Sequence, residues 1–265
     1  MSDITGINKP HMWVPKEVSN RMEGNFNMQH YQLSSMMHVT EADFVFLPRP
    51  GFYEMINFFN RTQYNYLQVF LASFDAGKDV DENDKNKMTL LFGTSDSLEI
   101  DAPFPLYAVR SNGSYEQDPD SERWINEYKT RKMPVLNTSL VRDPVENYCH
   151  AANSMTNTRR ISYERNYINE LMAEIDNLDS HYAWVSGFRA TFSSYCFRGK
   201  PNDPICNFIN RIFVIFEFTK KADGKDVVFY LDDVPGFMDR PASHNIIQNR
   251  SPFLGVDNGH LCPPC

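Results

Sequence analysis

The sequence lacks a long hydrophobic run. No stretch approaches the roughly 18 consecutive apolar residues that a membrane-spanning helix requires. The first six residues carry no basic segment followed by an apolar one, so a secretory signal is not expected. Without a secretory route, the Asn-x-Ser/Thr triplets are chance matches in an Asn-rich chain. We therefore expect a cytoplasmic protein without a membrane span.

Positive charge is also scarce. The formal net charge is −8 at pH 7, with 26 basic and 34 acidic residues. A nucleic-acid binder or a protein that binds anionic membranes needs a basic face. The basic clusters at Arg159–Arg160 and at residues 129–132 are both small. The partner that we expect is therefore another protein or a second copy of this chain, not a nucleic acid.

Motifs that identify an enzyme are missing as well. The sequence contains no Gly-x-Ser-x-Gly elbow, no His-Glu-x-x-His helix and no Walker loop. Cys149 and His150 offer a thiol and an imidazole. Neighbouring side chains usually point apart, however, and a catalytic dyad normally comes from separated positions. We do not expect this pair to be catalytic.

An acidic segment at residues 75–85 partly resembles a calcium-binding loop. Asp79, Asp81 and Asn83 occupy alternate positions, as the first ligands of an EF-hand do. Asp84 stands where the motif needs a glycine for its sharp turn, and Leu90 stands where it needs a bidentate glutamate. The sequence predicts a solvated acidic loop between two strands and not an EF-hand.

The composition favours an ordered globular protein. Hydrophobic residues make up 42% of the 265 residues and aromatic residues 14%, which is ample for a core. The densest apolar runs lie at residues 212–218 and 227–231, and Asp223-Gly224 lies in the polar break between them. Such a break is a strong β-hairpin signal. We expect this hairpin to form the centre of the core, with Phe213, Ile215 and Val228 buried.

Other strands and helices follow from apolar periodicity. We predict strands at residues 66–74, 88–92 and 106–110. We also predict four helices. The buried face of the first is formed by Tyr53, Ile56, Phe59 and Asn60, and that of the second, which Pro134 ends, by Trp124 and Tyr128. The third is capped by Ser162 and buries Tyr167, Ile168, Leu171, Met172 and Ile175, and the fourth begins at about Ser180 and buries Trp184, Phe188, Phe192 and Cys196.

These elements predict an α+β fold, mainly of antiparallel β-hairpins with helices packed on one face. A long irregular N-terminal arm (1–38) and a C-terminal tail complete it. After the arm we place a first half (39–133), an irregular connection (134–160) and a second half that includes the C-terminal tail (161–265). The two halves can form one domain. The order helix, strand, acidic break, strand occurs at 52–92 and again at 181–232. Residue identity between the two is too low to establish a repeat.

The C-terminus ends in Cys262-Pro263-Pro264-Cys265, preceded by His260. Two cysteines at this spacing can bind one metal ion, form a small-loop disulfide or remain free thiols. A structural zinc site needs four ligands, and the chain has no second Cys-x-x-Cys pair. We expect free or structural thiols and no resident cofactor. Zinc bound by His260, Cys262 and Cys265 is the alternative.

The sequence leaves the function open. The missing catalytic motifs and the aromatic content favour a non-enzymatic binding or assembly protein whose contacts come from hairpins and exposed aromatic loops. The alternatives are an enzyme with a dispersed active site and a thiol or zinc protein that uses the C-terminal cysteines.

Overall fold

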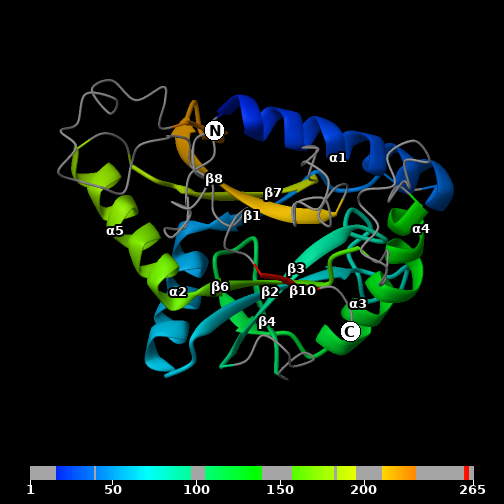
Figure 1. Ribbon diagram of the computed structural model, residues 1–265, viewed down its shortest axis with the longest axis horizontal. Coiled ribbons are helices and arrows are strands. Elements are labelled where there is room, and N and C mark those ends of the chain that lie inside the picture. The colour runs from blue at the N-terminus through cyan, green and yellow to red at the C-terminus, as the bar shows by residue number, and fades with distance from the viewer. Residues whose placement is uncertain are drawn as a thin grey trace, which may run out of the picture.

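A computed structural model describes residues 16–38, 40–96, 105–138, 157–181, 184–194, 211–230 and 260–262 (Figure 1). The helices are α1 (Lys16–Met37), α2 (Arg49–Arg61), α3 (Ser121–Glu127), the π-helix η1 (Tyr128–Lys132), α4 (Met133–Thr138) and α5 (Arg165–His181). The strands are β1 (Phe44–Pro48), β2 (Tyr66–Ser73), β3 (Met88–Ser95), β4 (Tyr107–Val109), β5 (Tyr115–Gln117), β6 (Arg160–Glu164), β7 (Gly187–Ser194), β8 (Ile212–Ala222), β9 (Lys225–Val228) and β10 (His260–Cys262). Within these ranges no helix is long and apolar enough to cross a membrane.

The strands form two antiparallel sheets, which confirms the α+β prediction. Sheet A has the order β1-β7-β8-β9, and sheet B has the order β10-β6-β2-β3-β4-β5. The predicted hairpin is β8-β9, and its turn is Asp223-Gly224 with φ of 50° and 76°. Positive φ at both central residues is what a tight type I′ hairpin turn requires.

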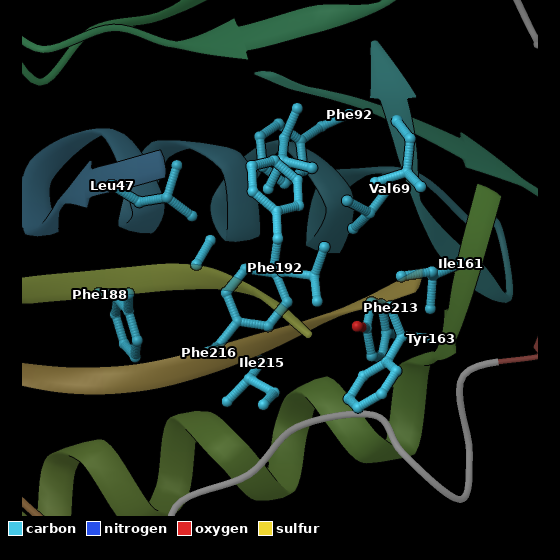
Figure 2. Packing of buried hydrophobic residues seen from close by; sticks show 14 of the residues in the cluster. Leu47, Val69, Phe92, Ile161, Tyr163, Phe188, Phe192, Phe213, Ile215 and Phe216 are labelled. Atoms are coloured by element: carbon cyan, nitrogen blue, oxygen red, sulfur yellow. The ribbon is translucent and has the colours of Figure 1, made fainter. Parts of the chain in front are cut away.

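One large hydrophobic cluster joins the two sheets. In Figure 2, Val69 and Phe92 of sheet B belong to the same buried cluster as Phe192 of sheet A. Phe213 and Ile215 of β8 are fully buried, as predicted. Val228, which was also predicted to be buried, is only half-buried, whereas the next residue, Phe229, is 6% exposed.

The order β-α-β-β occurs twice, as β1-α2-β2-β3 and as β6-α5-β7-β8. The first strand of each unit joins the sheet of the other unit, because β1 pairs with β7 and β6 pairs with β2. The helical segment before each first strand follows the same rule. Helix α1 packs on β7, and α3, which continues through η1 into α4 before β6, packs on β2. Sequential strands usually pair with each other, so this exchange ties the two units together.

The exchange has the same register in both units. Phe44, the first residue of β1, pairs with Thr191, the fifth residue of β7. Arg160, the first residue of β6, pairs with Phe70, the fifth residue of β2. The structure therefore contains a repeat, but not the one that the sequence pattern predicts. The pattern at 52–92 corresponds to α2, β2 and β3, whereas 181–232 contains the strands β7, β8 and β9, and the helix of the second unit is α5.

The predicted irregular arm is wrong for Lys16–Met37, which form α1. Met22, Phe26 and Leu33 are buried on one face of this helix. Their spacing of four and seven residues fits the helical period. The Asn, Gln and Ser residues between them hide the pattern, because these residues are weak helix formers or compete for backbone hydrogen bonds. Residues 1–15 lie outside the described ranges.

The helix predicted from about Ser180 is also wrong. Phe188 and Phe192 are buried in strand β7, which hydrogen-bonds to β1 and β8. Apolar residues four apart fit both a helix and a strand, because four is close to one helical turn and is twice the strand period. Ala190 completes the strand alternation. Cys196 lies outside the described ranges.

Pro134 does not end the second predicted helix. Tyr128 begins the π-helix η1, in which the Met133 N–H donates to the Tyr128 carbonyl, and the chain continues as α4 to Thr138. In a regular α-helix the proline ring would collide with the carbonyl four residues earlier. The wider π turn relieves that collision. Trp124 and Tyr128 are buried as predicted.

Ser162 caps no helix, because it lies inside β6 and α5 begins at Arg165. The predicted buried stripe of this helix is confirmed for Tyr167, Ile168, Leu171 and Ile175. The connection predicted to be irregular at 134–160 is helical up to Thr138, and β6 begins at Arg160. Residues 139–156, with Cys149 and His150, lie outside the described ranges.

Candidate functional site on the outer face of helix α1

The C-terminal candidates are described only in part. His260 and Cys262 lie in β10, where their backbones pair with Ser162 and Arg160 of β6. Their side chains, and the whole of Cys265, lie outside the described structure. Among the described side chains no group of three or more His, Cys, Asp or Glu could hold a metal ion. Zinc binding at the C-terminus stays a prediction.

The acidic loop between β2 and β3 is fastened to α3 by Arg123. Its Nε donates to Asp75 Oδ2 at 2.6 Å and its Nη1 donates to Asp79 Oδ2 at 2.8 Å. The hydrogen bond from Arg123 lowers the pKa of Asp79. Asp81 and Asp84 remain exposed. The loop is therefore solvated at its tip, while two of its carboxylates attach it to the helix.

A buried ion pair connects the segment before β1 to η1. Lys132 Nζ donates to a carboxylate oxygen of Glu41, and both side chains are fully buried. Desolvation lowers the pKa of Lys132, and the charge of Glu41 opposes that shift. Glu41 also accepts the backbone N–H of Met88 at the start of β3. Since the pair has no access to solvent, it connects elements and does not form a reaction centre.

A second network surrounds Glu217 of β8, which is fully buried. The carboxylate accepts hydrogen bonds from Arg189 Nε at 2.6 Å, Thr191 Oγ1 at 2.6 Å and Tyr230 OH at 3.1 Å. Burial and the nearby Glu217 charge raise the pKa of Tyr230. Arg189 also lies 3.6 Å from Glu23 of α1. This network fixes α1 to sheet A through groups that already satisfy one another.

Two arginines play the same structural part in the two repeated units. Arg49 begins α2 and donates to the Val185 carbonyl at 2.9 Å, and it also binds Asp179. Arg165 begins α5 and binds the Tyr64 carbonyl. Val185 and Tyr64 stand two residues before β7 and β2, so the positions are equivalent. Each arginine binds a residue of the other unit, so we interpret both contacts as structural ones that hold the two units together.

The outer face of α1 is different, because it exposes large apolar side chains. Met28 is 63% exposed and Tyr31 73%, and Met36, which lies farther round the helix near its C-terminal end, is 62% exposed. The opposite face is anchored: the Phe26 ring lies 5.9 Å from that of Phe192. In Figure 1, α1 lies at the outside of the molecule, along sheet A. The helix is therefore held firmly while its outer face stays accessible.

This face also carries no ionic charge along most of its length. From Gly24 to Thr40 the sequence contains no Asp, Glu, Lys or Arg. Helix α3, which packs on the equivalent strand β2, exposes Glu122 and Arg123 instead. A solvated helix normally has a charged outer face. The outer face of α1 has the composition of the centre of a protein interface, where Met and Tyr are enriched and charged residues are depleted.

Sequence reasoning missed this site, although one signal was available. The charge-free run from Gly24 to Thr40 is visible in the sequence. Which of its apolar residues are exposed depends on how the helix lies on β7, and that contact is between residues far apart in the chain.

Comparison with protein-family models, with curated proteins and with solved structures gives no match. The residues and their geometry are therefore the basis for assigning a function.

Proposed function

We propose that this chain is a non-enzymatic binding or assembly protein whose contact surface is the outer face of α1. The observation that carries the proposal is the exposure of Met28 and Tyr31, which share one helix face, in a segment without charged residues. Burying one such side chain contributes about 1.5–3 kcal/mol, because water is released from apolar surface. Burial of Met28 and Tyr31 by a partner would supply part of the free energy of binding.

Two further observations support a binding role. The hydrophobic contacts of Met22, Phe26 and Leu33 hold the helix in place, so a partner would meet a preformed surface and little ordering entropy would be lost. The ionic groups around Lys132, Glu217 and Arg49 are engaged with partners inside the chain. Within this proposal the protein acts in the cytoplasm, and its partner is a protein.

A photo-reactive amino acid placed at Tyr31 tests the proposal. The full-length protein carrying benzoylphenylalanine at this position is produced at its natural level in its own cells and irradiated. We expect a discrete cross-linked product, because a partner lies over this face. The same substitution at Tyr64, which is 44% exposed in the segment before β2, is the matched control and should give no such product.

A second variant separates specific binding from accidental contact. Met28→Glu places a charge in the middle of the surface, where burial would cost several kcal/mol, and should remove the Tyr31 product without changing the melting temperature. If irradiation at position 31 gives no product above that at position 64, α1 is not a binding surface.

A further inference from the structure

Gly24 is an unexplained residue in the middle of α1. Glycine is a poor helix former because it loses the most backbone freedom on folding. A Cβ atom added at Gly24 would meet no atom within 4 Å. The packing of the residues that the structure describes therefore gives no reason for a glycine there. A bulky side chain of another molecule that packs against this turn does, since it would leave no room for a side chain at position 24.

The exposed residues from Gly24 to Tyr31 form a surface on which side-chain size increases along the helix. Gly24, Asn27, Met28 and Tyr31 are all exposed and follow one another at three- and four-residue spacing, so they share one face. The smallest side chain is at one end and the largest is at the other. Gly24 and Tyr31 are two helical turns apart, about 10.5 Å along the axis. Asn27 and Met28 lie midway between them.

We infer that the partner of this surface is a second copy of the chain, which pairs its α1 antiparallel to the first; this rests on the proposed function. A two-fold interface requires a patch that is complementary to itself, so that residue i meets residue j and j meets i. With the axis at Asn27 and Met28, Tyr31 of each copy covers Gly24 of the other. The two Asn27 side chains meet at the axis, where each amide can donate to and accept from the other.

The charge distribution favours a second copy on this face. Each copy carries a formal net charge of −8, and like charges repel across most possible contacts. The segment from Gly24 to Thr40 contributes no Asp, Glu, Lys or Arg, so two copies that meet there avoid direct charge repulsion. A strongly basic partner would gain nothing from this face and would be drawn to acidic surface elsewhere.

The dimension of α1 predicts a weak dimer. Its 22 residues span about 33 Å, and a helix is about 10 Å wide. Such a face is smaller than the ~800 Å² per partner that is usual in stable complexes. We expect a dissociation constant in the micromolar range. Added salt should strengthen the dimer, because screening weakens the repulsion between the two acidic bodies.

Sedimentation velocity of the purified full-length protein tests the inference over a concentration series. The wild-type protein should shift from monomer to dimer as its concentration rises. Gly24→Ala should raise the melting temperature of the dilute monomer, because alanine is the better helix former. The same change should weaken the dimer by roughly tenfold or more, because the methyl group lies where Tyr31 of the second copy packs. Val227→Glu, at an exposed position of β9, is the control and should change neither quantity.

The outcomes separate this inference from the proposed function. A wild-type protein that stays monomeric at the highest concentration overturns the dimer. If Tyr31 then still cross-links to a different protein in cells, the binding role of α1 stands. Gly24→Ala that raises the melting temperature and leaves the dimer unchanged overturns the packing of Tyr31 on Gly24. A weaker dimer together with a more stable monomer supports it, because a merely structural effect would move both in the same direction.

Discussion

Lys132 shows how one buried residue can connect three elements. Its ammonium group donates to Glu41, before β1, and to the Asn86 carbonyl, before β3, while its own backbone lies in η1. A buried ion pair adds little net stability, since desolvating two charges costs about as much as their attraction returns. Breaking the pair is a different matter, because one charge then stays buried alone.

Lys132→Met should therefore lower the free energy of unfolding by about 3–5 kcal/mol. Adding Glu41→Gln to this variant should restore most of the loss, because the charge is gone and the amide oxygen still accepts the Met88 N–H. Urea unfolding at neutral pH measures both variants. Lys225→Met, at an exposed position of β9, should change stability by less than ~0.5 kcal/mol. A double variant no more stable than the single one would show that the ionic pair is not the cause.

At the scale of elements, strand β8 contributes most to the hydrophobic core. Its residues from Ile212 to Phe218 are buried on both alternating faces, the pattern of a strand covered on both sides. Phe213 is 0% exposed. The cost of shortening a side chain there includes both lost transfer free energy and the cavity left behind.

Phe213→Ala should cost about 3–5 kcal/mol of unfolding free energy. Thermal and urea unfolding measure the loss. Val227→Ala on the neighbouring strand is the control, since Val227 is 44% exposed and should lose far less. A melting temperature within a degree or two of that of wild type would show that β8 is not central to the core.

The sequence predicted those elements whose signal is local. Strands β2, β3 and β8 contain dense apolar, β-branched and aromatic runs, and Asp223-Gly224 gives a turn that is almost specific to hairpins. Strand β7 was missed because Phe188 and Phe192 fit two periods equally well, and its neighbours β1 and β8 decided between them. The exchange of β1 and β6 has no local signal, because it depends on which distant strands supply hydrogen-bond partners.

The candidate site was unpredictable for a related reason. Met28 and Tyr31 belong to a segment whose composition favours an irregular arm, and the contact of Phe26 with Phe192 stabilises it as a helix. Helical propensity alone is a weak guide when tertiary packing supplies the stability. The charge-free run could have drawn attention to this segment, but not to its outer face.

At the scale of the whole molecule, buried tyrosines set the response to alkali. Burial raises the pKa of Tyr128, whose OH donates to the Thr158 carbonyl at 2.7 Å. Burial, together with Tyr107, also raises the pKa of Tyr115. In the unfolded chain both titrate near pH ~10. Above that pH the folded state keeps protons that the unfolded state releases, so stability falls as the pH rises.

We therefore expect the urea midpoint to decrease between about pH 9 and pH 11. The depressed pKa of Lys132 acts in the opposite direction below about pH 10.5, because the unfolded state then holds the extra proton. Tyr128→Phe removes one of the tyrosines whose pKa is raised, a group that also includes Tyr230, and should make the decrease shallower. Ultraviolet absorbance reports tyrosine ionisation and circular dichroism reports unfolding. Measuring both across the same pH range shows whether the buried tyrosines ionise only when the protein unfolds. A midpoint that is independent of pH in this range would contradict the assignment.

The exchange of first strands has a consequence for synthesis on the ribosome. Helix α1 and strand β1 emerge early, yet the strand on which both pack, β7, begins only at Gly187. At about 5–20 residues per second, translation takes on the order of ten seconds to reach it. During that time Phe26 lacks its ring contact with Phe192 and Leu47 lacks its pairing with Phe188. The edge of β2 that pairs with β6 is open until Arg160 and the residues after it have been made. A nascent chain in this state exposes apolar surface and an open strand edge, both of which chaperones bind.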